Sequence, residues 1–508
     1  MSVESGEGGA GAPNNTEEEK LPEGWAWAAV SEVLVGSDTG KSFKCDPRPA
    51  APEEWGIIKV SAMTWGEFRS AENKALLDNT LVNRNYEIQS GDILVSRANT
   101  VEHVGAPVLV GDVRPRLLLS DKSLRFTPGS PVDRNWFVYW LRSPAVRKAI
   151  AAKASGTSDS MRNISQSDLK AIVLPIPPAA EQRRIADALD ERLARLDEMA
   201  QLIARARAHA TTLRKQILLN VIPEPANWPE DWRATTADQA GAIDLGRARH
   251  PDWHDGPKMR PYLRVANVFE DRIDTTTLME MDFSEGFGKY RLLPGDILLN
   301  EGQSPHLVGR PAMYKGIPEG VAFTNSLLRF RADDNVLPGW ALLVFRRHLH
   351  AGRFMREVRI TTNIAHLSTS RLKAVEFPVP TLDEQRRLVA ETKNRLARVD
   401  ALDLLLDRAE AHTAALRRAL LVEAFAGRLV PQDPDDEPAE DLLKRIRVER
   451  EAAEAERKAA HRAAAQAKRK SRSSAKQPAS TVAPPPAPTS KPPLPEGEQS
   501  TLPMEFTE

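Results

Sequence analysis

The chain has 508 residues, of which 41% are hydrophobic, and its 70 basic residues balance its 70 acidic ones. This length predicts about three domains, while the single cysteine, Cys45, excludes an internal disulfide and a cysteine-cluster zinc site. A neutral chain lacks the broad basic surface that is typical of nucleic-acid binders, and without an apolar run of membrane-spanning length we expect a soluble, cytoplasmic protein with no membrane contact.

The N-terminal half predicts a disordered start followed by one globular domain. Residues 1–20 are Gly, Glu and Asn with few apolar side chains, which predicts disorder. Residues 21–178 are expected to form a mixed α/β domain with an irregular sheet, because short apolar runs lie between Gly, Pro and Asp. We expect strands near residues 57–60, 93–95, 107–110 and 117–119, and one helix over 135–153.

A long helix is predicted over residues 179–222. The letters "PIPPAAEQ" place prolines before an acidic first turn, which is typical of a helix start. Apolar residues then recur at alternating spacings of three and four, as they do along the contact face of a coiled coil. Residues 179–222 would therefore form a spacer helix with one partner helix.

Most of this pattern then returns about 203 residues later. "LKAIVLPIPPAAEQRRIADALDERLARLDEM" (Leu169 to Met199) is matched by "LKAVEFPVPTLDEQRRLVAETKNRLARVDAL" (Leu372 to Leu402), and "GDILVSR" (Gly91 to Arg97) by "GDILLNE" (Gly295 to Glu301). Such a duplication predicts two similar domains, each followed by a similar helix. The second domain should span residues 223–381, with strands at 297–299 and 327–330 and a helix near 340–358, and the second spacer helix 382–426.

The two spacer helices are predicted to pair with each other as an antiparallel coiled coil, which gives the two domains a pseudo-twofold relation. A long helix lying on its own domain is the alternative. The residues that we expect to carry the pairing are Ile185, Leu189, Met199, Ile203, Leu402, Leu406, Leu416 and Leu420. We further expect facing residues to have numbers that add up to about 605, with Ile203 against Leu402, because Arg192 and Arg395 would then face small residues.

The C-terminal part predicts a connector and a charged helix over residues 427–470 with little apolar stripe, and a disordered Pro/Ser-rich tail over 471–508. The run from Lys468 to Lys470 could touch phosphate, although a solvated helix end is the plainer interpretation.

The search for catalytic motifs finds none that holds. "VGSDTGKS" around Lys41 resembles a phosphate-binding loop, but it has one residue too few before its Gly-Lys pair and no helix start after it. His250 and His254 have metal-like spacing, but Pro251 breaks the helix that would align them. We therefore expect a non-catalytic chain without a metal site.

The tandem "PxPxxxEQ" helix starts, "LPEGW", "GDIL" and "GRLVPQDPDDEPAEDLLKRIRVER" resemble the specificity subunit of type I restriction-modification systems, over residues 21–455. The resemblance implies two target recognition domains that each bind half of a split site in double-stranded DNA. It implies partners as well: two methyltransferase subunits docked on the helices, and a restriction-translocase subunit. No cofactor is expected on this chain, because S-adenosylmethionine, ATP and Mg would bind the partner subunits of this adenine methyltransferase and nuclease. Neutral charge then requires that phosphate attraction come from local patches or from the methyltransferases.

Candidate DNA-binding residues follow from side-chain chemistry and from the repeat. Polar segments follow the "GDIL" strand in both domains, and a second pair of matched loops lies at residues 155–163 and 356–366. Arginine pairs with guanine, and asparagine or glutamine with adenine. The candidates, each of which could instead lie in an ordinary polar loop, are Arg97, Asn99, Ser158, Arg162 and Asn163 in the first domain and Asn300, Gln303, Arg359, Thr362 and Asn363 in the second.

Two other classes of function stay open. A DNA-independent scaffold would use the two domains to bridge two copies of a protein partner, and an enzyme would need a site that the motif search does not find. A methyltransferase gene with an Asn-Pro-Pro-Tyr motif beside this one would favour DNA specificity over the scaffold.

Overall fold

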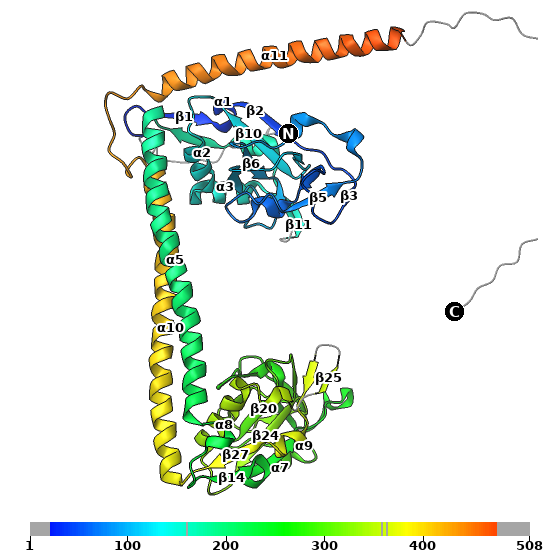
Figure 1. Ribbon diagram of the computed structural model, residues 1–508, viewed down its shortest axis with the longest axis vertical. Coiled ribbons are helices and arrows are strands. Elements are labelled where there is room, and N and C mark those ends of the chain that lie inside the picture. Colours follow the sequence, from blue (N-terminus) through cyan, green and yellow to red (C-terminus); the bar gives the residue numbers. More distant parts are fainter. Residues whose placement is uncertain (1–20, 159–160, 357–358, 362–363, 475–508) are drawn as a thin grey trace, which may run out of the picture. The chain divides into compact units, whose positions relative to one another are not determined.

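The computed structural model describes residues 21–158, 161–356, 359–361 and 364–474. The chain divides into two compact units (Figure 1). The first unit comprises the described parts of Met1–Gln182 and Asp433–Glu508, and the second comprises those of Arg183–Gln432. In these described ranges, no helix combines the length and apolarity that a membrane crossing requires.

The first unit is built around an antiparallel sheet whose four strands are, in spatial order, β2 (Leu34–Thr39), β10 (Ser123–Pro128), β6 (Ile93–Ser96) and β8 (Pro107–Leu109). All four residues of β6 are buried. A strand that is covered on both faces needs a continuous apolar run, and the last two residues of the "GDIL" motif together with Val95 provide one.

Two helices follow β10 where the sequence predicted one helix over residues 135–153. They are α2 (Arg134–Arg142) and α3 (Pro144–Lys153). Pro144 has no amide hydrogen and forces the preceding Ser143 into extended backbone, with φ −61° and ψ 147°. The single-helix prediction is therefore corrected, and the break follows from one proline.

A second sheet packs near the first, and its strands are, in order, β3 (Cys45–Asp46), β5 (Asn73–Leu76), β4 (Gly56–Ile58) and β9 (Leu117–Leu118). Strands β4 and β9 are parallel, and the other pairs are antiparallel. The 3-10 helix η1 (Val60–Met63) follows β4 and buries Ala62 and Met63 in the cluster that joins the two sheets. Two more turns, η2 (Asn79–Leu81) and η3 (Arg84–Tyr86), lead from β5 toward β6.

Smaller elements complete the first unit. Strand β1 (Ala26–Ala29) pairs antiparallel with β13 (Val173–Ile176). A three-stranded sheet has the order β11 (Ser155–Ser158), β12 (Met161–Asn163) and β7 (Ala98–Asn99). The short helices are α1 (Val30–Val33) and α4 (Gln166–Lys170).

The second unit repeats these sheets in the same strand order, except that the sheet corresponding to β5-β4-β9 has no described counterpart of β3. The main sheet consists of β15 (Gly241–Leu245), β24 (Leu327–Ala332), β20 (Ile297–Asn300) and β22 (Pro311–Met313). The other sheets consist of β14 (Arg233–Thr236) with β27 (Glu376–Val379), of β19 (Met279–Asp282), β16 (Met259–Leu263) and β23 (Ala322–Phe323), and of β21 (Gly302–Gln303), β26 (Ile364–His366) and β25 (Arg359–Thr361). This correspondence confirms the duplicated mixed α/β fold.

The second unit differs in its connections. It adds a hairpin of β17 (Val268–Phe269) and β18 (Arg272–Ile273). Helix α8 (Pro338–His350) packs on the main sheet through Phe345. The centroid of the Phe345 ring lies 5.0 Å from that of the Phe330 ring. The remaining helical turns are η4 (Pro225–Asn227), α6 (Ala237–Ala240), η5 (Pro251–Trp253), η6 (Val265–Asn267), α7 (Phe287–Tyr290), η7 (Phe354–Arg356) and α9 (Thr369–Lys373).

The two predicted spacer helices are α5 (Ala179–Val221) and α10 (Leu382–Phe425), which agree with the expected ranges to within one residue. Apart from the first turn of α5, both helices belong to the second unit, where they run side by side (Figure 1). Thr381 caps α10 by accepting a hydrogen bond from the amide of Glu384 at 3.3 Å. The predicted antiparallel coiled coil is confirmed by the ion pairs between the two helices.

These ion pairs also fix which residues face each other. In every pair the two residue numbers add up to 614 or 617, so one number rises along the coil as the other falls. The prediction of a sum near 605, with Ile203 against Leu402, is therefore wrong. The pairs are Arg207 with Asp407 (2.8 Å) and Glu410 (3.0 Å), Arg214 with Asp400 (2.5 Å) and Asp403 (2.9 Å), and Arg417 with Asp197.

The error has a physical cause. Arg192 and Arg395 were assigned to the contact face, but both are exposed, and the next residues, Leu193 and Leu396, are buried. In both helices, the contact-face residues can follow a spacing of three then four or of four then three around these positions. The first choice puts the arginine on the contact face and the second puts the leucine there, and the leucine is the one that is buried. Because neither arginine is buried, small residues need not lie opposite them, and a sum of 605 is not favoured.

A last helix, α11 (Ala439–Ser474), belongs to the first unit and packs against β2 and α1. Ala439, Leu442 and Ile446 are fully buried. Ser130 donates its amide to Glu449 at 2.9 Å, and Arg450 donates to the carbonyl of Ser31 at 3.0 Å. The prediction of a charged helix is confirmed, but its expected lack of an apolar stripe is corrected for the first two turns.

Candidate functional site

The small sheet β11-β12-β7 of the first unit joins two polar segments that lie far apart in the sequence. Strand β12 pairs antiparallel with β7, so that Arg162 lies opposite Asn99 and Asn163 opposite Ala98. The amide of Ile164 donates to the carbonyl of Arg97 at 2.9 Å, which fixes the end of β12 at the start of β7. Residues 97–99, Ser158 and residues 161–163 therefore form one edge, which we call the β7 edge.

The side chains of the β7 edge differ in their hydrogen bonds and in their exposure. Asn99 donates its amide nitrogen to Thr64 at 3.3 Å, and its oxygen accepts from the amide of Thr100 at 2.9 Å. Arg97 and Arg162 are half-buried, and the Nε of Arg97 is buried without a hydrogen-bond partner. Ser158 and Asn163 are exposed. An edge with one fixed amide and exposed polar neighbours can present donors and acceptors to a ligand.

The second unit carries the same edge on β21, β26 and β25, which we call the β21 edge. Gln303 lies opposite Ala365, and Arg359 lies opposite His366. The amide of Leu367 donates to the carbonyl of Glu301 at 2.8 Å, which repeats the contact between Ile164 and Arg97. Only the backbone of Arg359 is described, and the candidates Thr362 and Asn363 lie outside the described residues.

One candidate does not fit the site. Asn300 is the last residue of β20, pairs with Leu327 in the main sheet and is 0% exposed. A fully buried amide cannot contact the edge of a base, so the prediction of Asn300 as a DNA-binding residue is corrected. The predicted strand 297–299 ends one residue too early, and the equivalent residue of β6, Ser96, is buried as well.

Two residues of the β21 edge were missed. Glu301 and His366 lie within hydrogen-bonding distance, with His366 Nδ1 3.3 Å from the Glu301 carboxylate. Their equivalents in the first unit are Arg97 and Asn163, because the backbone contacts of the two edges match residue for residue. The match of "GDILVSR" with "GDILLNE" already places Arg97 against Glu301, and this exchange of an arginine for a glutamate gives the two edges different hydrogen-bonding chemistry.

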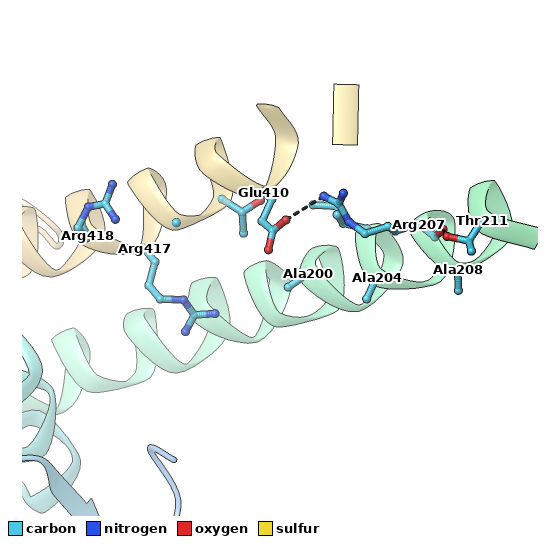
Figure 2. A pocket seen from close by; sticks show the side chains of 11 residues that line it. Ala200, Ala204, Arg207, Ala208, Thr211, Glu410, Arg417 and Arg418 are labelled. Carbon is cyan, nitrogen blue, oxygen red and sulfur yellow. Dashed lines mark hydrogen bonds and ion pairs between the residues drawn. The ribbon is translucent and has the colours of Figure 1, made fainter. Parts of the chain in front are cut away.

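A different surface lies along the coiled coil. A groove of about 710 Å³ runs between α5 and α10, with Ala200, Ala204 and Ala208 on one side and Glu410 on the other, bridged by Arg207 (Figure 2). Ile203 lines this groove together with Thr413 and Ala414. Because the side chains at the contact are small, the groove between the two helices stays open to solvent.

The predicted pairing residues only partly face inward. Ile185, Leu189 and Leu406 are buried, and Ile203 and Leu420 are half-buried. Met199, Leu402 and Leu416 are instead 47%, 38% and 39% exposed. Leu202, Leu213, Leu404 and Leu405 are exposed as well, so several apolar side chains reach the surface of both helices.

Neither edge nor groove holds a metal-binding constellation. Among the described residues, no group of three or more His, Cys, Asp or Glu side chains is placed to hold a metal ion. The geometry therefore offers hydrogen bonding at two edges and an apolar surface on two helices.

Comparisons with known proteins agree with this architecture. The family model "Type I restriction modification DNA specificity domain" matches residues 23–206. The EcoEI specificity subunit of Escherichia coli is 32% identical over 190 residues, which cover 37% of this chain and 32% of that subunit. The EcoKI specificity subunit of Escherichia coli strain K12 is 23% identical over 476 residues, which cover 87% of this chain and 99% of that subunit.

The fold is also found among solved structures. A chain from a structural study of "complex assembly" and "conformational transition" of the type I restriction-modification system has a TM-score of 0.64 at 21% identity, and the match covers 80% of this chain and 99% of that one. The chain thus carries a type I restriction modification DNA specificity domain over residues 23–206, and it is similar to type I restriction enzyme specificity subunits over most of its length.

Proposed function

We propose that this chain selects the DNA sequence on which a type I restriction-modification complex acts, with each unit binding one half of a split site. The observation that carries the proposal is the pair of matched edges. Both lie on the same three-stranded sheet of their unit, and both present polar side chains. Two similar binders in one chain fit a target with two parts.

The two half-sites should differ in sequence. The β7 edge offers Arg97 and Asn99, which suit guanine and adenine, whereas the β21 edge offers Glu301 and Gln303. A carboxylate accepts a hydrogen bond, which suits the amino group of cytosine. We therefore infer an asymmetric, bipartite site with a non-specific spacer.

The exposed apolar surface of α5 and α10 supports the docking of two methyltransferase subunits, and a restriction-translocase subunit would join that complex. S-adenosylmethionine, ATP and Mg would bind those partners, which would carry out the chemistry. The complex would work in the cytoplasm, where the DNA is. This chain contributes no reacting group and instead positions the partners on their target.

Methylome sequencing tests the function directly. Cells that carry the gene together with its methyltransferase gene should methylate one asymmetric bipartite motif, and deletion of this gene alone should abolish that mark. Methylation that persists without this chain, or a mark without a split motif, would refute the proposal.

A further inference from the structure

A cleft in the first unit gathers four lysines beside the β7 edge. The cleft has a volume of about 490 Å³ and lies between the segment that follows β2, the β4-β5 pair and the loop before β10. Asp121 is the only acidic residue that lines it. The four lysines are Lys41, Lys59, Lys74 and Lys122.

These cations have few partners of their own. Lys59 reaches Glu72 only at 4.0 Å. In the part of the chain that the structure describes, Lys41, Lys74 and Lys122 make no ion pair. Like charges around one cavity repel each other unless an anion lies among them. The cleft is therefore suited to a negatively charged ligand.

The cleft and the β7 edge share their supporting backbone. The carbonyl of Lys122 accepts a hydrogen bond from the amide of Arg97 at 2.8 Å. Val60 lines the cleft and begins η1, and Thr64, directly after η1, accepts the hydrogen bond from Asn99. A ligand at the β7 edge that is also a polyanion would therefore pass the cleft.

The second unit lacks this arrangement at equivalent positions. Strand β16 corresponds to β4, and Tyr262 corresponds to Ile57. Ile57 pairs with Lys74, whereas Tyr262 pairs with Met279, so a methionine takes the place of Lys74 in the second unit. The amide of Glu301 donates to the carbonyl of Ser326, so Ser326 takes the place of Lys122. Two of the four cations are thus absent.

The other two positions carry arginines, and one of them is engaged within the unit. Arg247, the equivalent of Lys41, stacks 4.0 Å from the ring centroid of Trp253 and donates to the carbonyl of Asp282. Arg264 takes the place of Lys59, between β16 and η6. The lysine cleft is therefore a property of the first unit and does not come from the shared fold.

We propose that the lysine cleft binds the phosphate backbone of the DNA strand whose bases face the β7 edge, so that the first unit supplies more of the phosphate attraction than the second. This proposal rests on the proposed function. It explains how a chain with no net charge can hold a polyanion, since three unpaired lysines lie where the strand would run. Each phosphate that a cation neutralises releases counterions and makes binding depend more steeply on salt.

The test compares two triple variants in the complex with the methyltransferase subunits. One variant carries Lys41→Gln, Lys74→Gln and Lys122→Gln in the cleft. The control carries Lys148→Gln, Lys153→Gln and Lys170→Gln, which remove the same charge from the same unit outside the cleft. The dissociation constant for duplex DNA is measured by fluorescence anisotropy over a series of salt concentrations, on the methylated motif and on a scrambled duplex.

The slope of log affinity against log salt concentration should be smaller in magnitude by about 1 to 3 in the cleft variant than in the parent complex. Each lost phosphate contact reduces the magnitude of this slope by about 0.9. The control variant should keep the parent slope. An unchanged slope in the cleft variant, or an equal loss in the control, would overturn the proposal. If the parent complex did not prefer its motif over the scrambled duplex, the proposed function itself would fail, which is a separate result.

Discussion

At the scale of single residues, the exchange of Arg97 for Glu301 between matched edges is the feature with the clearest consequence. The two residues occupy the same backbone position, since each carbonyl accepts the amide that follows β12 or β26. Their opposite charges mean that the two edges cannot prefer the same base pairs. The recognised sequence should therefore change in one half at a time when one edge is altered.

We predict that Arg97→Ala relaxes specificity in one half-site only. Loss of a bidentate contact between arginine and guanine costs about 1–3 kcal/mol of discrimination. Methylome sequencing of the variant should show one degenerate position in one half of the motif and an unchanged other half. Glu301→Gln is the matched change in the second unit, and it should affect the opposite half. A variant of Arg97 that altered both halves would show that the edges do not act separately.

His348 gives the second unit a dependence on pH that has nothing to do with DNA. It is fully buried in α8, donates from Nε2 to the carbonyl of Glu376 at 2.8 Å, and has no hydrogen-bond partner at Nδ1. Burial lowers the pKa of His348 from 6.5 to about 4, because a charged ring would lose its hydration. The folded chain therefore keeps this ring neutral in a range where the unfolded chain protonates it.

Stability should consequently fall as the pH drops from about 6.5 to about 4, since the unfolded state binds the extra proton in that window. The loss is about 3 kcal/mol from this one group, at about 1.4 kcal/mol per pH unit. Urea unfolding of His348→Gln, followed by circular dichroism, should show a flatter pH dependence, while the exposed His306→Gln should keep the parent curve. Equal curves for the parent and His348→Gln would contradict the assignment.

At the scale of elements, the coiled coil shows what periodicity can and cannot determine. The starts of α5 and α10 were predictable because prolines and acidic residues mark them. The antiparallel direction followed from chain order. The register could not be predicted in the same way. Alanines and a threonine at the middle of the contact mean that the apolar pattern hardly favours one alignment over another. Charge pairing between Arg207, Arg214 and Arg417 and their acidic partners supplies that preference.

We predict that Arg214→Asp weakens the pairing of the helices and that adding Asp403→Arg restores it. Exposed ion pairs contribute about 0.2–1 kcal/mol each, and Arg214 contacts two acids, so the single variant should lose about 1 kcal/mol or slightly more in urea unfolding. The double variant should recover most of that loss. In the register first predicted from the sequence, Arg214 and Asp403 would be far apart, and the second change would not rescue the first.

Helix α11 is held to the first unit by a few buried side chains at its start, and this attachment can be tested. Ile446 is fully buried and lies against Gly129. Ile446→Ala should destabilise the docking by about 2–4 kcal/mol, because it leaves a cavity. Hydrogen exchange of the first turns of α11 should accelerate in this variant. Val448→Ala removes a side chain that is 67% exposed and should leave the exchange unchanged; similar acceleration in both would argue against docking through Ile446.

The candidate site was predictable in kind and only partly in detail. The two polar segments of each domain were identified from chemistry, but nothing in the local sequence shows that residues 97–99 and 161–163 pair as strands. Asn300 was misplaced because a strand end is not marked by a proline or glycine there. Glu301 and His366 were missed because their chemistry becomes informative only when the two edges are compared.

At the scale of the whole molecule, the length of the coiled coil should set the spacing of the two half-sites. Residues 203–209 and 406–412 face each other in the observed register, because their end residues add up to 615, within the range of the ion pairs. Deleting both segments removes one heptad from each helix and keeps the remaining contacts aligned. The coil becomes shorter by about 10 Å, at about 1.5 Å per residue.

We predict that the deletion variant loses activity on the original motif and, where it remains active, accepts a spacer shorter by about three base pairs, at about 3.4 Å each. Methylation of a library of duplexes with every spacer length measures this. The deletion also rotates the ends of the coil, so the variant's helix content is checked by circular dichroism. Full activity on the original spacing would show that the coil does not set the distance.

The docking of α11 on the first unit has a consequence for biosynthesis. Residues from Ala439 leave the ribosome only after the whole second unit has been translated, yet they cover α1 and β2, which were made first. Until then the face that receives Leu442 and Ile446 is open to solvent and to other nascent chains. The first unit therefore depends on a helix that is translated after the second unit, and a premature stop before Ala439 would release a chain with that face uncovered.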